Sequence, residues 1–154
     1  MSIWGADPFE NDDAADWVAE LENDPNIERI LHAVDELADP VHVGYVEIPE
    51  CCVAVAAAAL LARLVSASNT SEPLSQESWS TLSSEMLACK PSQKCRMAHL
   101  AYLAVDRVLR DYEGSELQQQ WSVSHLGYDV WAAVMENLLD RLRRARDALG
   151  ERRS

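Results

Sequence analysis

Three carboxylates near the start of the chain have the residue type and spacing for cation chemistry. Asp12, Asp13 and Asp16 follow closely on one another, and Asp12 and Asp16 share one face if the segment is helical. Carboxylate oxygens are the ligands that Ca²⁺ prefers, but the D-x-[DN]-x-[DN]-G spacing of an EF-hand loop is missing. Helix capping and a solvated surface therefore explain these acids more simply than a cation site does. An acidic protein-binding surface is the other alternative.

The cysteines and one histidine offer a second, weaker metal set. Cys95 and His99 are four residues apart, which places both on one face of a helix. Zinc sites commonly include a C-x-x-C pair, and none occurs in this chain. Cys51 and Cys52 are adjacent within a helical pattern and cannot easily bridge each other. We therefore expect all four cysteines, including Cys89, to be free and mostly buried, with no bound metal or cofactor.

The sequence patterns of common enzymes are missing. Only five glycines occur, and none lies in a G-x-G or G-K-[ST] phosphate loop. There is no G-x-S-x-G elbow and no H-E-x-x-H zinc motif. We therefore assign no catalytic residue. An enzyme or cation-binding protein that uses Asp12, Asp13, Asp16 or Glu116 is kept as the alternative function.

The net charge of −13 comes entirely from the first fifty residues. They contain fourteen acidic residues against one base, Arg29, whereas residues 51–154 contain twelve of each sign. Folding does not require this segregation, because repulsion among like charges slightly destabilises a compact state. An acidic protein also repels the phosphates of nucleic acids. We therefore expect a basic protein as the partner and no nucleic acid.

The elements that must position these residues are helical, because apolar residues recur every three or four positions. Asn11 or Asp12 can cap the first helix, and Gly114 is expected at the C-terminus of a long one. Ser115 and Gln118 form an S-x-x-Q capping box for the short helix that follows. Residues 41–47 alternate like a strand but have no partner strand, so we expect an extended crossing segment there. The predicted helices cover residues 14–21, 27–37, 49–66, 79–87, 91–114, 115–121 and 128–149.

The predicted fold class is all-α, a single compact domain over residues 1–154. About six or seven helices should surround a central, Ala-rich helix at residues 51–66. The longest uncharged apolar run, residues 51–62, is shorter than the about 20 residues of a membrane span. The acidic start lacks the apolar core of a signal peptide. We therefore expect a cytoplasmic protein without membrane contact, and a homodimer through the C-terminal helix is a further expectation.

Two strings in the sequence carry a resemblance to a known family. The opening string is Trp4-Gly5-x-x-x-Phe9-Glu10-Asn11-Asp12-x-Ala14-x-Asp16-Trp17, and the second string is Gly114-Ser115-Glu116-Leu117-x-x-x-Trp121, followed by Trp131 and residues 138–142. Both resemble a family of small bacterial proteins, domain of unknown function 4259. One departure is Ala6-Asp7-Pro8, where relatives often place a further glycine. The resemblance implies a stand-alone bacterial domain and no particular activity.

The two strings are expected to touch in the folded protein. Trp4 and Phe9 should then pack near Trp121 or Trp131, and Trp17 should also be a core residue. The resulting hypothesis is a cytoplasmic bacterial protein-interaction module, of an inhibitor or immunity type, with an acidic N-terminal face. Its candidate binding residues are Asp12, Asp13, Asp16, Glu20, Ser115 and Glu116.

Overall fold

The computed structural model describes residues 5–38, 44–68, 70–123 and 127–151, and over these ranges the protein is all-α, as predicted. No strand occurs in them, and each helix coincides to within a few residues with a predicted segment. The helices are α1 (Asp12–Asn23), α2 (Ile27–Ala38), α3 (Ile48–Val65), α4 (Gln76–Leu87), α5 (Pro91–Arg110), α6 (Glu116–Ser122) and α7 (Tyr128–Glu151).

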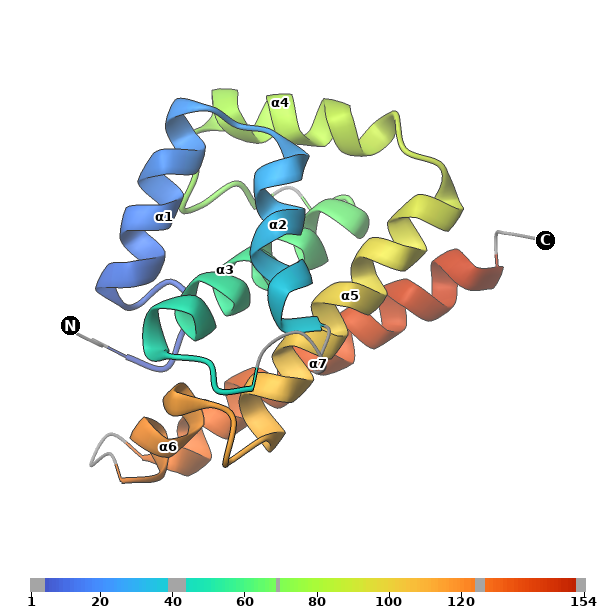
Figure 1. Ribbon diagram of the computed structural model, residues 1–154. Helices are drawn as coiled ribbons and strands as arrows, with labels where there is room; N and C mark the ends of the chain where they lie inside the picture. The colour runs from blue at the N-terminus through green and yellow to red at the C-terminus, as the bar shows by residue number, and fades with distance from the viewer. Residues whose placement is uncertain (1–4, 39–43, 69, 124–126, 152–154) are drawn as a thin grey trace.

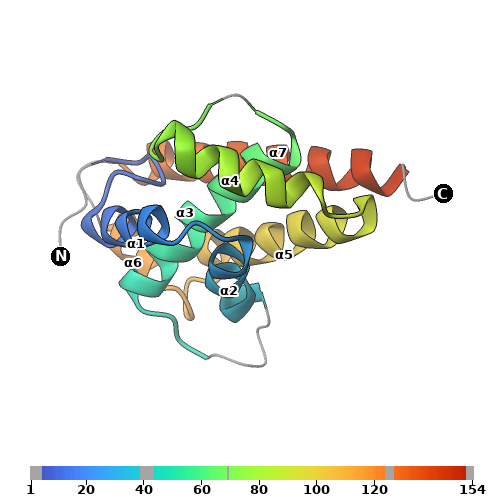
Figure 2. The same ribbon diagram turned by 90° about the horizontal axis from the view of Figure 1, so that it is seen from above.

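The central helix is α3, as its composition predicts. It packs against all six other helices, which Figures 1 and 2 show arranged around it. Its alanines allow neighbouring helices to approach closely, and thirteen of its eighteen residues are buried. By length and apolar composition alone α3 could cross a membrane, but the buried core helix of a soluble protein has the same properties.

The outer helices differ in how they pack. The long helices α5 and α7 run side by side in opposite directions, and α2 packs across α3 and α5. The short helices α1 and α4 rest mainly on α3. All seven helices contribute to one connected cluster of buried apolar side chains. As a result, α1 and the end of α7 lie at opposite ends of the molecule (Figure 1).

The extended segment before α3 pairs with the segment before α6. Val46 and Ser115 form an isolated parallel bridge, with the Val46 N–H donating to the Gly114 carbonyl at 2.8 Å. The expected helix cap at Gly114 is wrong, because α5 ends at Arg110 and Asp111 is its C-cap. Gly114 instead allows a close approach: a Cβ there would clash with the Asp111 carboxylate. Residues 41–43 of the predicted crossing segment lie outside the described ranges.

Two predicted helix caps are confirmed. Asn11 Oδ1 accepts a hydrogen bond from the Ala14 N–H at 2.8 Å and begins α1. Ser115 Oγ accepts one from the Gln118 N–H at 3.2 Å and begins α6. Each bond satisfies one of the backbone donors that the first turn of a helix leaves without a partner.

Candidate functional site

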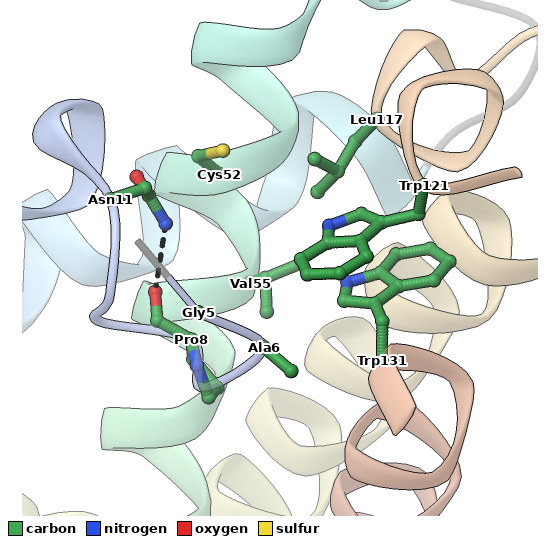
Figure 3. Close-up of a pocket in the computed structure, with 9 residues that line it drawn as sticks. All are labelled: Gly5, Ala6, Pro8, Asn11, Cys52, Val55, Leu117, Trp121 and Trp131. Carbon is green, nitrogen blue, oxygen red and sulfur yellow. Dashed lines mark hydrogen bonds between the residues drawn. The ribbon is translucent and has the colours of Figure 1, made fainter. Parts of the chain in front are cut away.

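The opening string and the second string meet in the core. Figure 3 shows Ala6 and Pro8, from the loop before α1, on one side of a cavity whose other side holds Trp121 and Trp131. The two indole rings are stacked, with centroids 5.9 Å apart and planes 5° apart. The cavity measures only about 20 Å³, which is room for a single water molecule. The junction is therefore packed core and not a ligand pocket.

The aromatic residues of the opening string play different parts. Phe9 places its ring beneath the guanidinium of Arg63 in α3, 5.2 Å from the ring centroid, in a cation–π contact. Contact with the tryptophan pair runs through Ala6 and Pro8 instead. Trp4, which was expected beside Trp121 or Trp131, lies outside the described residues.

Ser115 and Glu116 hold the fold together. Ser115 is only 1% exposed, and its Oγ also lies 3.8 Å from the Cys51 Sγ. Glu116 Oε1 accepts a hydrogen bond from the Ile48 N–H at 2.8 Å. Ser115 therefore cannot belong to an exposed acidic face, and the Glu116 carboxylate is already used by the first turn of α3.

The four acidic candidates of α1 point in two directions. Asp12, Asp16 and Glu20 are exposed and follow one another at four-residue intervals, so they form a stripe on the outer face. Asp13 is partly buried, and its Oδ2 has no hydrogen-bond partner among the described residues. Burial raises the pKa of the Asp13 carboxyl, and the carboxylates of Asp12, Asp16 and Glu50 raise it further.

Two adjoining hollows shape the acidic surface where α2 meets the start of α3. The first, of about 230 Å³, is lined by Trp17 of α1 together with Glu36 and Glu50. The second, of about 220 Å³, is lined by Tyr45 together with Glu36, Glu47 and Glu50. Glu36 and Glu50 border both hollows and form the wall between them. We refer to the pair as the acidic hollows.

Little positive charge competes inside the acidic hollows. Arg29 lines the first, but its Nε and Nη2 atoms lie 3.2 and 3.1 Å from the Asp24 carboxylate, which neutralises it. His32 also lines the first hollow, with its Nε2 3.4 Å from Glu36. Among the described residues, no base lines the second hollow and Glu50 forms no ion pair. A cation entering either hollow thus meets uncompensated carboxylate charge.

A comparison with known families identifies the chain. A family model described as a domain of unknown function, DUF4259, matches residues 2–134. The chain belongs to this family. The DUF4259 match covers α1 to α6 and the start of α7, and so includes both acidic hollows. No curated protein and no solved structure matches the chain.

The acidic hollows of this DUF4259 protein were not predicted from the sequence. Glu36 and Glu50 lie on different helices, and no residue spacing connects them. Only the acidic excess of the first fifty residues points to this region. Trp17 does pack against the core, as expected, but it is only partly buried and its remaining surface lines the first hollow.

The cysteines and His99 of this DUF4259 protein are not grouped as metal ligands. The Cys95 Sγ lies 3.4 Å from the Arg146 carbonyl oxygen, and the Arg146 guanidinium donates to the His99 Nδ1 at 3.2 Å. The guanidinium beside the His99 ring repels a metal cation there. All four cysteines are free, and the described residues contain no group of three His, Cys, Asp or Glu side chains that could hold a metal.

Proposed function

We propose that this DUF4259 protein is a protein-interaction module that docks a basic protein on its acidic hollows. The observation that supports the proposal best is the wall that the two hollows share. Glu36 and Glu50 line both hollows, together with Trp17 in the first and Tyr45 in the second. A positive side chain gains attraction from a carboxylate and from an aromatic face together. Two such hollows suit two arginine or lysine side chains of one partner.

The surrounding surface supports the same kind of partner. The exposed stripe of Asp12, Asp16 and Glu20 extends the negative field along α1. Such a field attracts a basic protein, speeds their encounter and weakens as salt is added. Asp13 contributes less to this face, because its carboxylate is partly buried.

Within this proposal the protein is a cytoplasmic, bacterial inhibitor of the immunity type. Charge complementarity supports that role: a protein that covers the basic surface of an enzyme prevents an anionic substrate from reaching it. The alternative, catalysis or cation binding by clustered carboxylates, needs those groups to converge in one site. Glu36, Glu47 and Glu50 line one hollow, but the described residues contain no group of three His, Cys, Asp or Glu side chains close enough to hold a metal ion.

The test compares two charge reversals that change the net charge equally. Glu36→Lys with Glu50→Lys alters the shared wall. Glu77→Lys with Asp129→Lys is the matched control, because both residues are exposed and neither lines a hollow. Glu50, Glu77 and Asp129 all lie in the first turn of a helix, so the control carries two bases at such positions and the hollow variant carries one. Any destabilisation from this cause should thus be at least as large in the control.

Wild type and both double variants are immobilised in parallel and exposed to a lysate of the native host, and bound proteins are identified by mass spectrometry. We expect a basic protein to bind wild type and control but not the hollow variant. With that protein purified, the association rate at low salt should fall about tenfold or more for the hollow variant alone. A partner retained equally by all three proteins would contradict the proposal. Asp12→Lys with Asp16→Lys then tests whether the α1 stripe takes part.

A further inference from the structure

The end of the molecule opposite α1 carries a concentration of basic residues. The start of α5 and the last part of α7 lie together there (Figures 1 and 2). The only acids on these two segments are Asp140, Asp147 and Glu151. The bases are Lys90, Lys94, Arg96, Arg141, Arg143, Arg144 and Arg146. Residues 51–154 are therefore neutral as a whole, but their bases gather into a positive surface at one end of the molecule.

A groove opens beside this basic end. Its volume is about 770 Å³, and it lies between α4 and the last turns of α7, with the end of α3 and one residue of α5 completing it. It exists because α4 packs on α3 and α2 and does not pack closely on α7. We refer to it as the α4–α7 groove.

The charges in the α4–α7 groove have one sign. Arg63 and Lys94 line it, and no acid is among the described residues of its lining. The Arg63 guanidinium also lies over the Phe9 ring and donates to the Glu72 carbonyl oxygen. Lys94 is partly buried, and its side-chain ammonium group forms no ion pair or hydrogen bond with a described residue. Burial lowers the pKa of Arg63, and the nearby positive charge of Arg141 lowers it further, although Asp7 and Glu72 act in the opposite direction. A carboxylate placed in the groove would relieve this repulsion.

The shape and polarity of the groove suit a helix. Its lining includes the apolar side chains of Trp79, Met86 and Leu87; the first two are 4% and 2% exposed, and Leu87 is 76% exposed. The walls carry small side chains, among them Ser83 of α4 and Ala148 of α7. Small side chains along the groove allow the backbone of a bound helix to approach closely. The apolar side chains that line it can contact the apolar face of an amphipathic helix.

We propose that the α4–α7 groove binds an acidic amphipathic helix of a partner protein. The apolar face of that helix rests on Trp79, Met86 and Leu87, and its carboxylates meet Lys94 and Arg63. A foreign helix is favoured over a second copy of this chain, because a second copy brings a net charge of −13 and a short helix brings only a few negative charges. This surface lies apart from the acidic hollows and involves a partner of opposite charge.

The first experiment selects peptides without assuming a partner. A displayed library of random peptides of about 15 residues, long enough to form a helix, is selected on the wild-type protein. The Ala148→Trp variant, whose new side chain fills the groove, is used to remove peptides that bind elsewhere. We expect the enriched peptides to carry apolar residues at helical spacing, with Asp or Glu on the flanking positions. An enrichment of basic or neutral peptides, or no enrichment, would overturn the proposal.

The second experiment measures the affinity of one enriched peptide. Lys94→Glu should weaken binding about tenfold or more, while Arg96→Glu, the same charge change on an α5 residue outside the groove, should leave it within about twofold. Ala148→Trp should abolish binding, and Ala133→Trp, at another exposed alanine of α7, should not. If the two variants of either matched pair weakened binding equally, the proposal would be overturned. Glu36→Lys with Glu50→Lys should not weaken peptide binding, so the two surfaces are tested independently.

Discussion

The Oε1 atom of Glu116 accepts a hydrogen bond from the backbone N–H of Ile48 at 2.8 Å, across 68 positions of sequence. The bond satisfies the first turn of α3, where the N-cap residue Glu47 makes no side-chain capping bond. Next to it, the Glu116 N–H donates to the Val46 carbonyl at 3.0 Å. An acid of the second string thus helps to position the central helix.

The first prediction concerns this cap. Glu116→Ala should lower the free energy of unfolding by about 1–2 kcal/mol, because a backbone donor and the positive end of α3 both lose an acceptor. Glu116→Gln keeps an acceptor oxygen and should lose less. Urea unfolding measures both variants. Glu113→Ala, at an exposed neighbour, should stay within about 0.5 kcal/mol of wild type. A loss at residue 116 no larger than that would show that the cap contributes nothing.

The second prediction concerns the tryptophan pair. Trp121 is 3% exposed and stacks on Trp131. Trp121→Ala should therefore cost about 3–5 kcal/mol, since it removes a large buried side chain and leaves a cavity. Trp121→Phe, which keeps an aromatic ring, should cost clearly less. Thermal and denaturant unfolding give both values. If Trp121→Ala unfolded like wild type, residue 121 would belong to a binding surface and not to the core.

The third prediction concerns pH. The Glu22 carboxylate accepts hydrogen bonds from the Ser75 N–H, from the Ser75 Oγ at 2.9 Å and from the Ser78 Oγ at 2.7 Å. These bonds, led by the Ser75 N–H, lower the pKa of Glu22 from its ordinary 4.5. A carboxyl whose pKa is lower in the folded state stabilises the fold above the unfolded pKa. That contribution is lost as the pH falls through the folded pKa.

Glu22→Gln should accordingly lower the free energy of unfolding by about 1 kcal/mol near neutral pH. The difference from wild type should shrink as the pH falls below about 4.5, the ordinary pKa of glutamate. Urea unfolding at a series of pH values measures it. Glu20→Gln, an exposed position on the same helix, is the control and should show no comparable loss. A pH-independent difference at Glu22 would rule out the ionised carboxylate as the cause.

The fourth prediction concerns the thiols. Burial raises the pKa of Cys52 to about 12, and burial also raises the pKa of Cys51. Because the thiolate is the reactive form, the partly exposed Cys89 and Cys95 should react first with a thiol reagent in the native protein. All four should react once the protein is unfolded without reductant. Only two reactive groups at that stage would indicate a disulfide.

The local sequence pattern was sufficient to predict the helices. Apolar residues at helical spacing indicate which side of each helix is turned away from water. This can be predicted from the segment's own sequence, without knowing which helices pack against it. The Ala-rich composition of residues 51–66 likewise predicted the central helix. The prediction that Gly114 ends a helix was wrong because glycine serves two purposes: it can end a helix, and it can let another backbone segment approach closely. Only the pairing of Val46 with Ser115 in the folded protein shows that the second purpose applies here.

The arrangement of charge was decided by the tertiary structure alone. Glu36 and Glu50 share a wall because α2 packs against α3, and the bases of α5 and α7 gather at one end because these helices lie side by side in opposite directions. The cap at Ser115 was predicted from local sequence, but its burial was not, and neither was the bond from Glu116 to Ile48 across 68 positions. Both residues had been selected as candidates for an exposed binding face. Side-chain spacing determines the faces of one helix, but only the packing of helices determines which faces meet.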